Sequence, residues 1–233
     1  MSPRPVASAR LPKAAQRSRG AAPDVRRAAA GLGAVIATLT ALGIGAMTVD
    51  FGPLWIFDLD REWVVPAVFS AGVLGWAAFL AARLARAGPA SRLRPVWWWA
   101  LAVLFAFMCL DELTSIHERL EAATGVDWQL LYAPLVAVAG FGWLRALFSF
   151  RSRSGSVLWA LGAAAWFVAQ VFEYLQYDGD RLIHAWMIVP EESLEMTGSS
   201  LWVLALLTAL HSLPDRRRDQ GERRRARRLE SAG

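Results

Sequence analysis

The sequence predicts an all-α, polytopic membrane protein, a bundle of six transmembrane helices with both termini in the cytoplasm. Three observations support this class. The 233-residue chain is 55% hydrophobic, which is high for a soluble domain. Six stretches reach the ~20 apolar residues that a helix needs to cross a bilayer core about 30 Å thick. The basic residues are distributed unevenly between the connecting segments, as the positive-inside rule requires.

The six apolar stretches follow one another with short connections. The first contains small residues four apart (Ala37, Ala41 and Gly45), which let a neighbouring helix approach closely. Tryptophans such as Trp63 and Trp97 mark the ends of the second and third stretches, as in an aromatic belt at the membrane interface. In order, the predicted helices are Ala28 to Thr48, Trp63 to Leu84, Val96 to Ile116, Trp128 to Phe148, Ser156 to Tyr177 and Glu191 to Leu213.

Charge gives these helices an orientation. Both tails and the second and fourth connections hold 22 of the 25 Lys and Arg residues, leaving only Arg61, Arg119 and Arg181 on the opposite side. Fifteen of the 20 acidic residues fall on that opposite side. A five- or seven-helix count would disrupt this pattern, so the basic side is predicted to be cytoplasmic.

Three regions follow from this division. Residues 1–27 are predicted to form a disordered basic leader, residues 28–213 the six-helix domain, and residues 214–233 a disordered Arg-rich tail. The net charge of +5 is therefore a topology signal, and we expect membrane lipids and no nucleic acid as partners. Anionic-lipid binding is an alternative role for the tail. The single cysteine, Cys109, excludes an intrachain disulfide.

Polar residues interrupt three of the predicted helices. Ionisable side chains inside a bilayer are costly, so they normally face the bundle interior or a wet cavity. In the third stretch, polar residues recur at i, i+3, i+4 and i+7 and are predicted to share one helical face. These residues are Asp111, Thr114, Ser115 and Glu118. Glu112 and His117 are expected on the flanking faces.

The fifth and sixth stretches carry similar groups. Gln170, Glu173 and Tyr177 are predicted to share one face of the fifth helix. In the sixth, Pro190 is a favoured first helical residue, and the carboxylates that follow it are Glu191, Glu192 and Glu195.

Helix geometry predicts that these groups lie at one depth. At 1.5 Å per residue, Asp111 and Glu173 lie about 23 and 25 Å from the inner starts of their helices, and Glu195 lies about 7 Å below the outer start of its own. Tyr132 of the fourth helix reaches a similar level. An acidic site is therefore predicted at the outer side of helices three, five and six.

Such a cluster predicts one of two chemistries. Carboxylates repel one another in a low dielectric, so the group needs either a retained proton or a cation. We assign acid–base or metal-binding roles to Asp111, Glu112, Glu173 and Glu195. Supporting or substrate-binding roles fall to Ser115, Gln170, Tyr177 and Tyr132. Additional ligands for a divalent metal would be His117, Glu118, Glu191 and Glu192.

Simpler interpretations exist for some of these residues. Glu191 and Glu192 also suit the positive end of a helix dipole, and His117 and Glu118 also suit a solvated helix end. The Glu-x-x-His pairs typical of di-iron bundles are absent from the sequence. The metal interpretation is thus permitted by the sequence and not specified by it.

The segments DELTSIHE (Asp111 to Glu118) and EESLEMTG (Glu191 to Gly198) resemble paired motifs in uncharacterised multi-pass bacterial membrane proteins. The resemblance covers helices three to six. It implies a bacterial plasma (inner) membrane protein and brings no known activity with it. Alkaline-ceramidase-like hydrolases use a closely spaced histidine pair, which the scattered His117, His184 and His211 do not reproduce.

Three functions compete at this stage. The first is a membrane-embedded enzyme acting on a lipid-like substrate, favoured because the inner halves of most helices contain few ionisable groups. The second is a proton- or cation-coupled transporter whose path includes Ser199, Ser200 and Thr208. The third is a structural or sensory protein whose carboxylates pair with Arg119 or Arg181.

Overall fold

The computed structural model describes residues 13–49, 52–61, 63–88, 91–178 and 181–213. Within them, the chain is helical apart from short connections and one pair of two-residue strands. Six helical segments are long and apolar enough to cross a membrane, which confirms the predicted fold class. These segments are Val25–Thr48, Val65–Ala87, Pro95–Thr114, Trp128–Leu147, Arg153–Gln176 and Ala185–His211.

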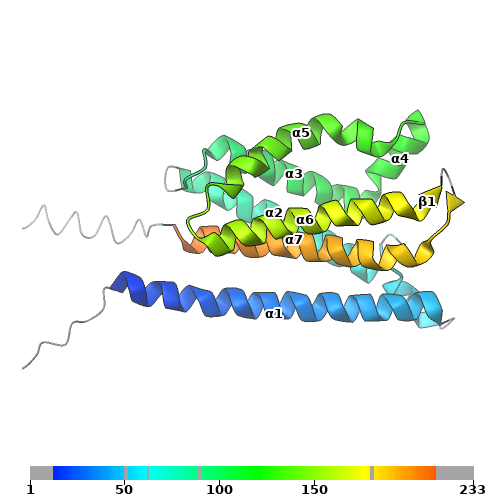
Figure 1. Cartoon of the computed structure of the whole chain (residues 1–233), viewed down its shortest axis with the longest axis horizontal. Helices are drawn as coiled ribbons and strands as arrows, with labels where there is room; N and C mark the ends of the chain where they lie inside the picture. Colours follow the sequence, from blue (N-terminus) through cyan, green and yellow to red (C-terminus); the bar gives the residue numbers. More distant parts are fainter. Residues whose placement is uncertain (1–12, 50–51, 62, 89–90, 179–180, 214–233) are drawn as a thin grey trace, which may run out of the picture.

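The elements follow the chain in a simple up-and-down order (Figure 1). They are α1 (Lys13–Thr48), η1 (Gly52–Phe57), α2 (Val65–Ala87), α3 (Pro95–Thr114), α4 (Ile116–Thr124), α5 (Trp128–Leu147), α6 (Arg153–Gln176), β1 (Tyr177–Asp178), β2 (Arg181–Leu182), η3 (Ala185–Met187) and α7 (Ile188–His211). Prolines stand at the first turns of α2 and α3, where the missing N–H costs no hydrogen bond.

The first helix is longer than the sequence predicts. It begins at Lys13 and not at Ala28, so residues 13–27 of the predicted leader continue the helix. Alanine is frequent in this segment, and alanine has the highest helix propensity. Residues 1–12 and the predicted tail at residues 214–233 lie outside the described residues.

The third helix is shorter than predicted, and this is the main correction to the expected site. α3 ends at Thr114 because Ser115 adopts a left-handed conformation with φ 45° and ψ 52°. α4 then restarts at Ile116. The predicted polar stripe is therefore wrong beyond Thr114: Ser115 forms the break, and Glu118 belongs to a separate helix.

The bundle core lies between α2, α3, α6 and α7, with α1 against α7 and α5 against α3 (Figure 1). The rings of Phe105, Trp159 and Trp202 meet at centroid distances of 5.2 to 6.1 Å. The indole N–H of Trp159 donates to the Trp143 carbonyl at 3.1 Å, and that of Trp202 to the Trp159 carbonyl at 3.2 Å. These two tryptophans are core residues and not part of an interfacial belt.

Helices α6 and α7 cross at two glycines. A Cβ atom on Gly198 would lie 2.5 Å from Cδ1 of Trp166 and 2.8 Å from the Gly162 carbonyl oxygen. A Cβ on Gly162 would lie 2.6 Å from Cδ1 of Trp202. Only glycine permits this approach, which stacks Trp166 on Trp202 at 6.0 Å and an interplanar angle of 7°.

The two ends of the bundle differ in charge. The α2–α3 and α5–α6 connections lie together at one end (Figure 1). They carry Arg92, Arg94 and Arg151, and Arg153 begins α6 at the same end. The start of α7, the end of α6, α4 and η1 gather at the other end (Figure 1). We call these the basic end and the acidic end, because the second one holds the carboxylates described next.

Candidate functional site

The break at Ser115 brings His117 back onto Asp111. Oδ1 of Asp111 accepts the backbone N–H of His117 at 3.0 Å, and Oδ2 lies 2.9 Å from Nδ1 of the imidazole. Because a carboxylate only accepts, Nδ1 carries the proton. The sequence placed His117 on a flanking face, whereas the turn makes it the direct partner of Asp111.

Helix α5 supplies aromatic groups around this pair. The Tyr132 hydroxyl donates to Oδ1 of Asp111 at 3.0 Å. The Trp128 ring lies 5.3 Å from the imidazole and 5.5 Å from the Tyr132 ring, measured between centroids. Asp111 thus accepts three hydrogen bonds. The imidazole of His117 is fixed by its hydrogen bond to Asp111 and by its contact with the Trp128 ring. Among the described residues, none forms a hydrogen bond with Nε2 of His117.

Polar side chains extend the site across α6 to α7. Nε1 of Trp128 donates to Glu173 at 3.2 Å. Gln129 donates to Gln170 at 3.4 Å, and Gln170 donates to Glu195 at 3.3 Å. These contacts join α5, α6 and α7 at one level of the bundle. The rise of 1.5 Å per residue along each helix predicts such a common level.

The remaining carboxylates crowd the start of α7. Gln176, which is buried at the end of α6, donates a hydrogen bond to Glu191. The charges of Glu112, Glu191 and Asp60 lie close enough to Glu192 to repel it. Glu195 experiences the same repulsion from Glu192 and Glu112. This group therefore concentrates carboxyl groups within a membrane-spanning bundle, where they cannot all be ionised without a neutralising partner.

The surroundings of His117 favour its charged form. Burial opposes protonation, but the hydrogen bond that His117 donates to Asp111 and the charges of Asp111, Glu118 and Glu173 outweigh it, so the pKa of His117 lies above its ordinary 6.5. A raised pKa in the folded state means that the pair stabilises the fold below the ordinary pKa. This contribution is lost as pH rises through the raised value.

Not every predicted site residue joins the network. Glu118 is exposed on α4, and Ser115 acts through its backbone at the break. Tyr177 lies in β1, beyond the end of α6, and its side chain is outside the described part of the structure. Pro190 is the third residue of α7 because the helix begins at Ile188.

The structure adds residues that the sequence did not single out. Trp128, Gln129 and Gln176 all bind site residues. Gln176 stands three residues after Glu173, so the helical spacing could have placed it on the same face as that predicted site residue. Trp128 gave no such signal because a tryptophan at a helix start is typical of an interfacial belt.

The described residues contain no group of three or more His, Cys, Asp or Glu side chains arranged to hold a metal ion.

Some of the hydroxyl groups deeper in the bundle form hydrogen bonds and others do not. Ser199 accepts the indole N–H of Trp166 at 3.0 Å, and Thr208 donates to the Ala205 carbonyl at 2.6 Å. The buried hydroxyls of Ser70 and Ser200 have no hydrogen-bond partner among the described residues.

Comparison with known proteins identifies one matching family, and the description of that family names no activity. Residues 28–209 match the family described as Domain of unknown function (DUF8692). The matched region runs from the first spanning segment into the last. No curated protein and no solved structure matches the chain.

Proposed function

Because the chain belongs to the DUF8692 family, whose description assigns no activity, we propose a function from the site geometry alone. The protein is a membrane-embedded enzyme that performs acid–base chemistry on a lipid-like substrate at the acidic end of the bundle. The two segments DELTSIHE and EESLEMTG supply most of its ionisable groups.

The Asp111–His117 pair carries this proposal. A carboxylate that accepts from Nδ1 fixes the tautomer and orientation of an imidazole, leaving Nε2 to exchange a proton with a substrate. Three hydrogen bonds hold Asp111 at distances of 2.9 to 3.0 Å. His117 is the proton-transfer group, and Asp111 and Tyr132 are positioning residues. Glu173 and Glu195 are candidates for the second acid or base.

The surroundings of the site support a lipid-like substrate. Helices α5 and α6 contact each other little along their backbones, and at the acidic end Trp128 and Gln129 bridge them through side chains. Leu130 and Tyr174 beside this seam are 68% and 76% exposed. A polar seam flanked by membrane-facing apolar groups suits a molecule with a polar head and an apolar chain.

Lipid turnover tests the proposal. The probe is the total polar lipid extract of the membrane in which the protein resides, incubated with the purified full-length chain in detergent micelles. We expect mass spectrometry to show loss of one lipid species and appearance of its product. Elemental analysis of the same sample tests the alternative that a divalent metal neutralises the carboxylates. An unchanged lipid profile with metal present and absent would contradict the enzyme proposal.

One observation favours a second function, a proton- or cation-coupled transporter. The buried hydroxyls of Ser70 and Ser200, which no described residue binds, lie on two packed helices, α2 and α7. Ser199 stands four residues after Glu195 and continues its face of α7 by one turn, and Ser200 follows it directly in the chain. Proton or cation flux into proteoliposomes that is lost in Glu195→Gln, without any lipid conversion, would favour transport over catalysis.

We propose that the acidic end faces outward and that both termini are cytoplasmic, in a bacterial plasma membrane. The charge distribution between the connections supports this orientation. Cys109 is the only cysteine, so a Cys109→Ala background accepts single cysteines at the exposed Ala123 and Ser154. In intact cells, we expect a membrane-impermeant maleimide to label Ala123→Cys but to label Ser154→Cys only after lysis. The reverse pattern would contradict the orientation.

A further inference from the structure

One tryptophan at the acidic end contacts two ionisable groups that come from different helices. Trp128 begins α5, where its backbone N–H donates to Glu121 of α4 at 3.3 Å. Its ring lies 5.3 Å from the His117 imidazole, measured between centroids, and its Nε1 donates to Glu173 of α6 at 3.2 Å. His117 and Glu173 therefore both contact the same indole.

Neighbouring groups of α5 hold this indole in place. The Tyr132 ring packs against it at a centroid distance of 5.5 Å. Asp127 caps the helix by accepting the backbone N–H of Gln129 at 2.8 Å, which fixes the first turn that carries Trp128. Since α5 and α6 contact each other little along their backbones, the Trp128 side chain is the direct link between the imidazole and the Glu173 carboxylate.

The two candidates for the second acid or base differ in their relation to His117. The charge of Glu173 is among those that favour the protonated imidazole, together with the charges of Asp111 and Glu118. Glu195 lies among the carboxylates of α7, and the charges that act on it most strongly are those of other carboxylates. This difference favours Glu173 as the second group.

Several other charged groups face Glu173. Asp127 acts on it from the start of α5, and His117 acts on it from α4. Its charge also acts on three carboxyl groups of α7, which are Glu191, Glu192 and Glu195. Within this set of described groups, His117 is the one that can carry positive charge, so a negative charge on Glu173 is best compensated by the imidazolium beside Trp128.

We propose that His117 and Glu173 are the two proton-transfer groups of the site and that Trp128 is the positioning residue between them. This inference rests on the proposed enzymatic function. Nε2 of neutral His117 takes a proton from one substrate atom, and the protonated Glu173 carboxyl gives its proton to a second substrate atom. The substrate loses one proton and gains one, which leaves an imidazolium and a carboxylate. Return of a proton from His117 to Glu173 through water restores the starting state.

The pH dependence of lipid turnover by the full-length protein tests the assignment of Glu173. A reaction that needs one deprotonated and one protonated group should give a bell-shaped profile in the wild type. Glu173→Gln should lower the rate about 10²- to 10⁴-fold and remove one limb of the bell. Glu173→Asp keeps a carboxyl group, so it should retain part of the rate and both limbs.

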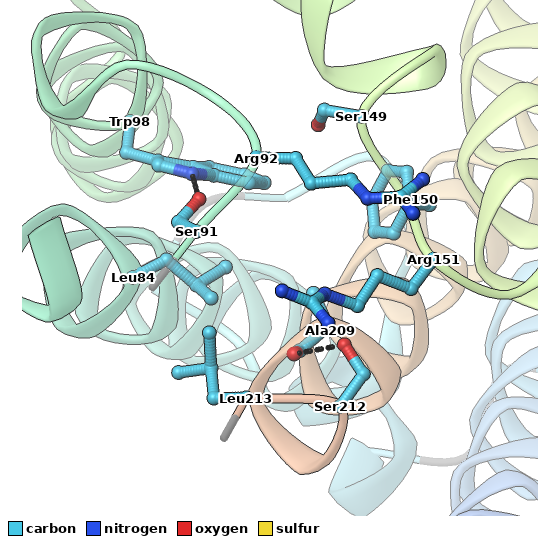
Figure 2. Close-up of a pocket in the computed structure, with 10 residues that line it drawn as sticks. All are labelled: Leu84, Ser91, Arg92, Trp98, Ser149, Phe150, Arg151, Ala209, Ser212 and Leu213. Atoms are coloured by element: carbon cyan, nitrogen blue, oxygen red, sulfur yellow. Dashed lines mark hydrogen bonds between the residues drawn. The ribbon is translucent and has the colours of Figure 1, made fainter. Parts of the chain in front are cut away.

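Trp128→Phe tests the positioning role. Phenylalanine keeps a ring beside His117 but removes the N–H that binds Glu173, so the rate should fall about 10²-fold. The pKa of His117, followed by NMR, should also fall, because the carboxylate that favours the imidazolium is no longer held beside it. The matched control is Trp98→Phe at the basic end, which removes the indole N–H that donates to Ser91 at 2.6 Å (Figure 2). It should leave the titration of His117 and the pH profile unchanged.

The outcomes distinguish this inference from the function on which it rests. Glu173→Gln should lower the pKa of His117 more than Glu195→Gln does. Equal shifts in these two variants, a bell-shaped profile that persists in Glu173→Gln, or identical behaviour of Trp128→Phe and Trp98→Phe would overturn the proton-transfer pair and leave the lipid-directed enzyme in place. Absence of turnover in the wild type would overturn the enzymatic function and the pair together.

Discussion

Replacing His117 with glutamine should lower lipid turnover by about 10²- to 10⁴-fold, the usual contribution of a general acid or base. Glutamine retains polarity at this position but cannot exchange a proton near neutral pH. Its amide can still donate to Asp111, so the positions of α3, α4 and α5 should be preserved. The measurement is the initial rate of product formation by mass spectrometry, with circular dichroism to verify helix content.

The matched control is His211→Gln at the basic end. Nδ1 of His211 lies 2.7 Å from the Leu207 carbonyl oxygen, so the change removes an imidazole and its local hydrogen bond far from the site. We expect near wild-type turnover in this variant. Equal activity of the His117→Gln and wild-type proteins would exclude His117 as the proton-transfer group.

The pH profile separates a positioning role of Asp111 from a structural one. If neutral His117 is the base, activity rises as pH passes through its pKa, which Asp111 raises against the effect of burial. Asp111→Asn removes the negative charge, so the rise should move to lower pH and the maximal rate should fall. A lower rate with an unmoved profile would indicate that Asp111 only maintains the fold.

The second large effect is expected at the α6–α7 crossing. Gly198→Ala should destabilise the protein by about 1 to 3 kcal/mol, the typical cost of overpacking. The added Cβ would meet the Gly162 carbonyl oxygen at 2.8 Å and Trp166 at 2.5 Å. The first of these contacts is with backbone, which can be relieved only by separating the two helices. The measurement is the free energy of unfolding in mixed micelles.

Gly140→Ala provides the control for this change. It makes the same substitution inside α5, where a new Cβ would meet nothing within 4 Å. Alanine has the higher helix propensity, so this variant should be as stable as the wild type or slightly more stable. Similar stabilities for the Gly198 and Gly140 variants would show that α6 and α7 are not packed through their glycines.

The spanning helices follow directly from the sequence because their signal is local. About 20 apolar residues between charged connections predict a helix wherever they pack. The role of individual residues inside the bundle is not local. Trp159 is fully buried and bonded to the Trp143 carbonyl, although its sequence context resembles that of interfacial tryptophans. Only the packing of α3, α6 and α7 distinguishes the two cases.

The site was predictable only in those features that depend on local sequence. Helical rise placed Asp111, Glu173 and Glu195 at one level, since depth depends only on residue number. The partner of Asp111 was not predictable in this way. His117 reaches it through a left-handed residue at Ser115, a conformation that is uncommon for a residue other than glycine. A continuous helix would have kept the two side chains on different faces.

Histidine NMR in detergent tests most directly whether Asp111 holds His117 as the titrating group of the site. The chain has only three histidines, so single His→Gln variants assign each imidazole signal. We expect His117 to titrate above 6.5 in the wild type and at a lower pH in Asp111→Asn, with no such fall in Asp58→Asn, whose carboxylate pairs with Arg61. A His117 pKa at or below 6.5 in the wild type, or one that Asp111→Asn leaves unchanged, would contradict the proposed site.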